Sequence, residues 1–174
     1  MAYQKAWLEK PLTYRISDVP ADNTLLPGMK HELEIMNDPH SSRTLRLAKA
    51  SMDVAESFEI RSDQDEVTLL AADPRGFLYG LFSLQREIKD QLATPAKPLR
   101  MINHWDNMDG SVERGYAGRS LFFEGGEIIL HERQRQYARL LASVGINAIS
   151  FNNVNVDDRA SKLLLAEDHE ALKA

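Results

Sequence analysis

The chain has 174 residues, of which 43% are hydrophobic and 27% are charged, values typical of a folded soluble protein. Its formal net charge of -5 and its lack of clustered Lys and Arg argue against a nucleic-acid partner, because phosphate binding depends on such clusters. The absence of cysteine excludes disulfides, thiolate metal ligands and a cysteine nucleophile.

The apolar runs are short, far below the roughly 20 residues that a membrane-spanning helix needs. The first residues also lack the basic and apolar regions of a secretory signal. We therefore expect no membrane partner and, by default, a cytoplasmic protein.

The first half of the sequence predicts a small sheet with helices on one side. Residues 6–16 favour a strand interrupted by Pro11, and residues 27–36 favour a short helix with Pro27 in its first turn. Three further strands are indicated by alternating or β-branched apolar residues, at 43–50, 57–62 and 66–73. The last two flank a short polar segment, which predicts a β-hairpin.

Residues 73–92 predict a longer helix. Asp73 is a suitable N-cap, and Pro74 would occupy the first helical position. The apolar residues recur at three- and four-residue spacings that give one helix face: Leu78, Leu81, Phe82, Leu84, Ile88 and Leu92. Two glycines four residues apart, Gly76 and Gly80, favour close approach of this helix to a sheet rather than phosphate binding.

Pro95 and Pro98 mark a junction, which divides the chain into a domain at 1–94, a linker at 95–98 and a second region at 99–174. The second region begins with a short strand, interpreted as buried because of Leu99, Met101 and Ile102. A helix follows at 128–145, ended by Gly145, and then a strand at 146–154. This order predicts two parallel strands in a βαβ unit.

The helix at 128–145 presents one apolar face, made of Ile129, Leu130, Tyr137, Leu140, Leu141 and Val144. Both predicted strands end in polar residues, and such carboxyl ends carry the functional loops of α/β folds.

The loop between them, residues 103–123, is rich in charged residues and glycine. Four carboxylates in or beside it could supply a general acid and base for glycoside hydrolysis, or they could cap turns and pair with arginines: Asp106, Asp109, Glu113 and Glu124. The second interpretation is favoured, because a short loop rarely holds two carboxylates rigidly apart. Trp105 lies between two polar residues, and its indole could present a flat apolar face to a sugar ring.

Two other kinds of site are not supported. Gly110 and Gly115 have the spacing of a phosphate-binding loop, but Tyr116 and Ala117 replace the Lys and hydroxyl residue that it requires. The five histidines are scattered without metal-ligand spacing, so we expect no metal and no cofactor.

Two long segments, "PLRMINHWDNMDGSVERGYAGRSLFF" (98–123) and "YARLLASVGINAISFNNVNV" (137–156), closely resemble the α-glucuronidases of glycoside hydrolase family 67. A weaker likeness extends upstream over 58–84, and the likeness fades after Val156. We interpret this loss of likeness after Val156 as the result of a frameshift, a gene fragment or a deliberate truncation.

The resemblance implies an α/β fold: a small N-terminal α/β sandwich of the hexosaminidase type, then a (β/α)8 barrel of which only the first β-α-β elements are present. It implies hydrolysis of α-1,2-linked glucuronic acid, or its 4-O-methyl ether, from substituted xylooligosaccharides by an inverting mechanism. By resemblance, Trp105 and Val154 would contact the 4-O-methyl group. Asp106, Asn153 and Asn155 would lie in or beside the same part of the sugar pocket.

The family's glutamic general acid and the acidic pair on the base side lie on later barrel strands, and no position of this sequence corresponds to them. A barrel needs about 250 residues, so the chain would be an incomplete α-glucuronidase of xylan degradation, inactive alone. Two alternatives stay open, a structural or complementing fragment and a weak carbohydrate-binding module. The free edge of the second strand also favours self-association.

Overall fold

The structure is a computed structural model that describes residues 11–20, 26–88 and 90–151. It is a mixed α/β protein. The chain divides into two compact units between Pro98 and Leu99.

The first unit is built on a five-stranded sheet with the strand order β1-β2-β4-β3-β5. Its strands are β1 (Arg15–Asp18), β2 (Thr44–Lys49), β3 (Phe58–Asp63), β4 (Glu66–Ala71) and β5 (Gln91–Ala93). The pairs β1–β2 and β2–β4 are parallel, whereas β3 runs antiparallel to both β4 and β5. The predicted hairpin is therefore confirmed as β3 and β4.

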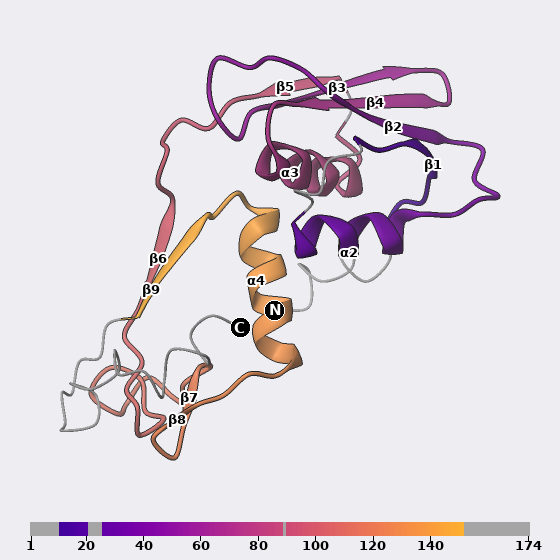
Figure 1. The fold of residues 1–174 in the computed structure, drawn as a ribbon. Helices are drawn as coiled ribbons and strands as arrows, with labels where there is room; N and C mark the ends of the chain where they lie inside the picture. Colours follow the sequence, from indigo (N-terminus) through magenta and orange to yellow (C-terminus); the bar gives the residue numbers. More distant parts are fainter. Residues whose placement is uncertain (1–10, 21–25, 89, 152–174) are drawn as a thin grey trace. The chain divides into compact units, whose positions relative to one another are not determined.

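Two helices, α2 (Pro27–Met36) and α3 (Pro74–Gln85), lie on the same side of this sheet (Figure 1). The alternating strand residues that face them are buried, as Leu45 and Leu47 of β2 and Leu69 of β4 show. From α3, Leu81 and Phe82 complete this core. The prediction of a small sheet with helices on one side is confirmed.

The start of α3 is as predicted, but its end is not. The Asp73 side chain accepts hydrogen bonds from the backbone N–H groups of Arg75 and Gly76, and Pro74 follows it at the first position. The helix stops at Gln85 rather than continuing to residue 92. Leu92 lies in β5 instead and is 69% exposed, so its assignment to the buried helix face was wrong.

The stop of α3 is made by the backbone. Glu87 has a φ of 59°, and its N–H bonds the carbonyl of Leu84 while the N–H of Ile88 bonds that of Ser83. These are the two bonds of a Schellman C-cap, in which a left-handed residue turns the chain away from the helix axis. Ile88 is therefore also past the helix.

The strand expected at 6–16 is observed only from Arg15 to Asp18. Residues 11–14 precede β1, and Tyr14 forms an isolated bridge with Asn37. Residues 6–10 lie outside the part of the chain that the structure describes.

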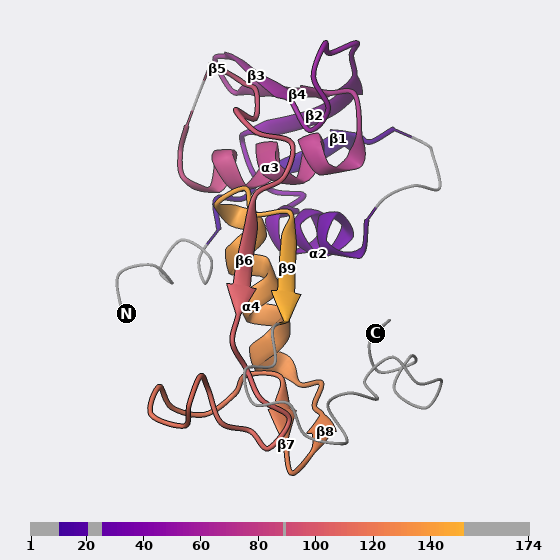
Figure 2. The same cartoon turned by 90° about the vertical axis from the view of Figure 1, so that its left-hand side faces the viewer.

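The second unit contains the predicted βαβ arrangement. The strands β6 (Met101–His104) and β9 (Ala148–Phe151) pair in parallel and flank α4 (Glu132–Ser143) in the sequence (Figure 2). Asn147 fixes their register, because its side-chain oxygen accepts from the N–H of Arg100 and its own N–H donates to the carbonyl of that residue. Gly145, at a φ of 79°, ends α4 as predicted. The predicted start at residue 128 was wrong, because the helix begins at Glu132 and Ile128 belongs to β8. Leu130 and Val144 of the predicted apolar face are 56% and 60% exposed.

The interpretation of the first strand as buried was wrong. Leu99 precedes β6 and is 61% exposed, and Met101 is 48% exposed. Side chains alternate along a strand, so only one face of β6 can turn toward α4. On β9, Ile149 is likewise exposed.

The loop between β6 and α4 contains structure that the sequence did not predict. Its strands β7 (Phe123–Glu124) and β8 (Glu127–Ile128) form a short antiparallel hairpin. The turn residues Gly125 and Gly126 both have positive φ, the geometry of a type I′ turn. A small core of Met108, Phe122 and Phe123 lies beneath the loop, with Leu121, Ile128 and Tyr137 packed against it.

Candidate functional site

The loop after β6 is a compact structure held by side chains. Asn107 is buried, and its amide nitrogen donates to the hydroxyl of Ser111 at 2.9 Å and to the carbonyl of Glu113 at 2.6 Å. The N–H of Asn107 also donates to the carbonyl of Ser111. A buried amide with several partners holds a loop in one conformation, because leaving such a group unpaired is costly.

Asp106 connects the two ends of this loop. It is only 4% exposed, and its Oδ2 accepts hydrogen bonds from Ser120 Oγ at 2.5 Å and from the N–H of Leu121 at 3.2 Å. Ser120 Oγ in turn accepts from the N–H groups of Phe122 and Phe123, both at 2.9 Å. The carboxylate therefore joins the end of β6 to the segment that enters β7.

His104 joins the same strand end to α4. Its Nε2 lies 3.0 Å from the hydroxyl oxygen of Tyr137, and its Nδ1 lies 3.6 Å from Asp106 Oδ1. Its ring packs edge-on against those of Phe122 and Tyr137, with centroid distances of 4.9 and 5.4 Å. Burial, followed by the nearby charge of Asp106, raises the pKa of Tyr137, so this phenol keeps its proton at neutral pH.

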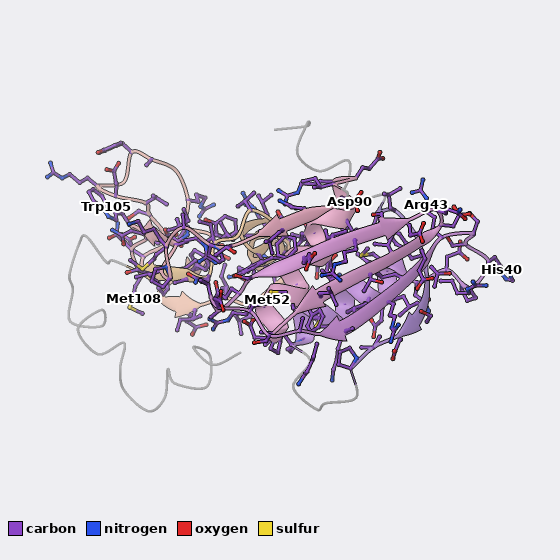
Figure 3. The ribbon with its side chains drawn as sticks, turned by 90° about the horizontal axis from the view of Figure 1, so that it is seen from above. His40, Arg43, Met52, Asp90, Trp105 and Met108 are labelled. Carbon is purple, nitrogen blue, oxygen red and sulfur yellow. The ribbon has the colours of Figure 1, made fainter. Side chains whose placement is uncertain are left out.

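Trp105 lies between these two anchored residues, and its side chain is available to solvent. It is 44% exposed, while its carbonyl accepts a 2.7 Å hydrogen bond from the N–H of Glu113. Trp105 and Met108 are both labelled in Figure 3, in the part of the ribbon that carries the loop. A fixed backbone with an exposed indole is an arrangement that suits stacking against a ligand ring.

The other loop carboxylates make local contacts. Asp109 accepts from the hydroxyl and the N–H of Ser111, and these two bonds lower the pKa of Asp109. Glu113 hydrogen-bonds the exposed Tyr116, which raises the pKa of that phenol. The exposed Glu124 belongs to β7. For Asp106 and Asp109, these contacts are of the turn-stabilising kind that the sequence favoured over acid–base catalysis.

Three predicted pocket residues, Asn153, Val154 and Asn155, lie outside the described residues. Of the candidate metal ligands, His131 caps α4 by accepting from the N–H of Arg133, and His104 has the contacts given above. In the described ranges, no group of three or more histidine, aspartate and glutamate side chains is placed to hold a metal ion. Likewise, none of the helices seen there is both long and apolar enough to cross a bilayer.

Sequence reasoning missed three members of the site, namely His104, Ser120 and Tyr137. One signal was available for His104. Neighbouring residues at a strand end point to opposite faces, so an exposed Trp105 requires an inward-facing His104. No comparable signal marked Ser120, whose contact with Asp106 spans fourteen residues of irregular chain.

Solved structures define the general class of the fold, which is shared with carbohydrate-active enzymes. A GH20 exo-β-N-acetylglucosaminidase from Vibrio harveyi matches with a TM-score of 0.53, 9% identity and coverage of 82% of this chain and 22% of that one. A GH138 enzyme that targets pectin rhamnogalacturonan II matches with a TM-score of 0.56 and 15% identity over 92% of this chain and 22% of that one. At such identities the likeness concerns the fold alone.

The sequence comparisons are more specific. The model of the glycosyl hydrolase family 67 middle domain matches residues 82–173, more than half of the chain. The chain belongs to this family. The match runs through the tail, so the expectation that the likeness fades after Val156 was wrong, and the interpretation of a frameshift there loses its basis.

Curated relatives include two fungal proteins. "Alpha-glucuronidase A" of Aspergillus tubingensis is 43% identical over 125 residues, which are 67% of this chain and 14% of that protein. "Probable alpha-glucuronidase A" of Aspergillus terreus is 46% identical over 110 residues, 59% of this chain and 13% of that protein. The chain thus spans about one seventh of the length of these relatives.

Proposed function

We propose that this chain is the part of an α-glucuronidase of xylan degradation that carries one wall of the sugar pocket. The whole enzyme would hydrolyse α-1,2-linked glucuronic acid, or its 4-O-methyl ether, from substituted xylooligosaccharides with inversion. The family membership and the names of the relatives support this proposal. The first unit would be the N-terminal α/β domain, and β6, α4 and β9 would begin a (β/α)8 barrel.

The observation that supports this proposal most directly is the position and the solvent exposure of Trp105. This residue follows the carboxyl end of the first parallel strand, where barrel enzymes bind their substrates. Its indole is exposed while the residues on both sides are anchored. Such a surface suits the apolar face of a uronic acid ring and its methyl ether. Asn153, Val154 and Asn155 would add to this wall, as the family resemblance implies.

The chain alone is proposed to lack hydrolytic activity. Inverting hydrolysis needs a carboxylic acid to protonate the leaving oxygen and a carboxylate about 6.5–9.5 Å away to activate water. In this loop, both oxygens of Asp106 face protein groups, and Asp109 is bonded to Ser111. The family resemblance assigns the acid and base to later barrel strands.

Two measurements on the purified chain test this proposal. We expect no release of glucuronic acid from an aldouronic acid, and a saturable heat of binding in calorimetry with millimolar 4-O-methylglucuronic acid. Trp105→Ala should abolish that heat, whereas Leu130→Ala, which changes an exposed residue ahead of α4, should leave it unchanged. Turnover that disappears in Trp105→Ala would overturn the claim of inactivity, and the absence of saturable heat would overturn the role of Trp105.

A second candidate function is completion of a barrel whose other strands come from another polypeptide. The exposed apolar residues of the parallel pair favour it, since Met101 and Ile149 are 48% and 41% exposed. Exposed apolar residues favour association with another surface. In the described part of the chain β6 and β9 pair in a two-stranded sheet, so each presents an outer edge that can recruit a further strand or a second copy. Light scattering of the chain with and without the remaining segment of a family 67 barrel distinguishes these cases. A chain that stays monomeric and binds no added segment would contradict both.

A further inference from the structure

We infer that Asp106 and His104 are positioning residues that hold Trp105 ready for a saccharide, without contacting the sugar themselves. The inference rests on the proposed function of Trp105. It differs from the expectation that Asp106 belongs to the pocket lining, and it adds His104, Ser120 and Tyr137 as the groups through which the carboxylate acts.

The different roles of His104 and Trp105 follow from their opposite orientations at the end of β6. Successive side chains of an extended segment point to opposite sides. The His104 side chain turns inward, with an exposure of 17%, and lies against the rings of Phe122 and Tyr137. Trp105, one residue later, is 44% exposed. Any movement of the His104 backbone would therefore also move the indole.

His104 has a polar contact on each ring nitrogen. Its Nε2 lies 3.0 Å from the hydroxyl oxygen of Tyr137, and its Nδ1 lies 3.6 Å from Asp106 Oδ1. These two contacts connect α4 through His104 to Asp106, so the imidazole ring is held between a residue of the helix and the carboxylate.

The other oxygen of Asp106 fixes the far side of the loop. Its Oδ2 accepts from Ser120 Oγ at 2.5 Å and from the N–H of Leu121 at 3.2 Å. Ser120 is anchored by its own N–H, which donates to the carbonyl of Gly110 at 2.8 Å. With an exposure of 4% and both oxygens directed at protein groups, Asp106 has little surface left for a ligand.

Trp105 is therefore held at three points, through the side chains of its two neighbours and through its carbonyl, which bonds the N–H of Glu113. A ligand that stacks on an indole whose backbone is already fixed has less of the protein to order, and such ordering is a recognised part of the cost of binding. Removing the contacts of Asp106 or His104 that hold Trp105, here called the support of Trp105, should weaken saccharide binding by about threefold to tenfold. This is the range expected when a ligand must immobilise one more side chain.

The sequence offers a direct reporter of this support. It contains two tryptophans, Trp7 and Trp105, so Trp7→Phe leaves Trp105 as the single indole. In that background we would measure time-resolved fluorescence anisotropy and acrylamide quenching, with circular dichroism to verify folding. Three variants test the support: Asp106→Ala removes it, Asp106→Asn keeps an oxygen for Ser120 and Leu121, and Tyr137→Phe removes only one hydroxyl. Glu127→Gln, at an exposed position of β8, is the matched control for a neutralised carboxylate.

We expect Asp106→Ala to lower the residual anisotropy of Trp105 and to raise its quenching constant at least twofold. Asp106→Asn should keep the residual anisotropy and the quenching constant close to those of the parent. Tyr137→Phe should change both less than Asp106→Ala does, and the Glu127→Gln control should match the parent. If Asp106→Ala does not fold, the comparison of Tyr137→Phe with the parent decides. Unchanged anisotropy in every folded variant would overturn the inference.

Titration of the same proteins with 4-O-methylglucuronic acid separates the two claims. A parent that binds, with a Kd raised threefold to tenfold in the loosened variants, supports both. A loosened variant that binds as tightly as the parent overturns the positioning role but not the proposed function. If the parent does not bind the sugar, the proposed function is contradicted. The anisotropy measurement would still show whether Asp106 orders the indole.

Discussion

Gly80 of α3 lies directly on Leu69 of β4, so closely that a Cβ on Gly80 would be 2.3 Å from Leu69 Cδ1. Leu69 is fully buried in the core of the first unit. Overpacking of a tight core costs about 1–3 kcal/mol, which exceeds the gain of up to about 1 kcal/mol from replacing a helical glycine with alanine. We therefore expect Gly80→Ala to destabilise the first unit by about 1–2 kcal/mol, measured by urea unfolding.

Two other glycines give the comparison. A Cβ on Gly76 would lie 2.4 Å from the backbone oxygen of Ser57, which cannot rotate away as a leucine methyl can. Gly76→Ala should therefore cost more than Gly80→Ala. The exposed Gly28 has only an ordinary contact, 3.9 Å from Leu78, so Gly28→Ala should be neutral or slightly stabilising. Equal effects at all three positions would contradict the close packing of α3 on the sheet.

Glu87 gives a prediction of the opposite sign. It ends α3 with a φ of 59°, a conformation that costs a non-glycine residue about 1 kcal/mol. Glu87→Gly should raise the free energy of unfolding by about 0.5–1 kcal/mol in the same urea assay. Glu87→Ala is the control, because it removes the charge but keeps the Cβ. A gain of the same size in Glu87→Ala would show that charge, and not backbone geometry, is responsible.

The C-terminal ends of the two helices explain why the sequence predicted the end of α4 correctly and the end of α3 wrongly. Both end in a Schellman motif, with the N–H of Ile146 bonded to Leu141 and that of Ile88 bonded to Ser83. In α4 the left-handed position is Gly145, which is a recognisable stop signal. In α3 it is Glu87, a good helix former, and the apolar spacing continues through Ile88 and Leu92. The strand β5 was missed for the same reason.

The candidate site shows a similar division. Trp105 could be singled out as a ligand contact because polar residues flank it, and the parallel strand pair followed from the order strand, helix, strand. The support under Trp105 could not be predicted, because it depends on pairings between residues that lie 14 and 33 positions apart. Such pairings are set by the folded loop and leave no periodic pattern in the sequence.

Alkaline pH should destabilise the protein through Tyr14. Burial raises the pKa of Tyr14 above its ordinary value near 10, and the neighbouring Arg43 offsets part of this effect. Above that pH the unfolded chain loses the phenolic proton before the folded chain does, so the stabilising contribution present at neutral pH is lost as the pH rises. The slope per group is at most about 1.4 kcal/mol per pH unit.

Urea unfolding between pH 8 and 11 measures this loss. Tyr14→Phe should flatten the alkaline decline, because the group that titrates is removed. Tyr116→Phe is measured beside it and should flatten the decline less, since Tyr116 is 73% exposed and the pKa of this phenol is raised by its hydrogen bond to Glu113 rather than by deep burial. A decline that is the same in Tyr14→Phe as in the parent would show that another group controls alkaline stability.

Asp73 is expected to be one of the most sensitive surface positions of the first unit. Its Oδ1 caps α3, and its Oδ2 accepts from the N–H of Glu56 at 2.6 Å. Asp73→Ala should cost about 2–3 kcal/mol, the sum of a lost N-cap and an unpaired N–H. Asp73→Asn should cost less, because its oxygen can still cap the helix. Asp53→Ala, at an exposed position, should fall within about 0.5 kcal/mol of the parent.

The central claim, that Trp105 offers a saccharide surface on a chain without hydrolytic activity, is tested most directly by NMR. Purified chain is mixed with a 4-O-methylglucuronic-acid-substituted xylooligosaccharide, and one-dimensional saturation-transfer spectra are collected over time. We predict transfer from the protein to the sugar O-methyl protons that is lost in Trp105→Ala, with no anomeric signals of free 4-O-methylglucuronic acid. Transfer that persists in Trp105→Ala, or the growth of free-sugar signals, would contradict the account.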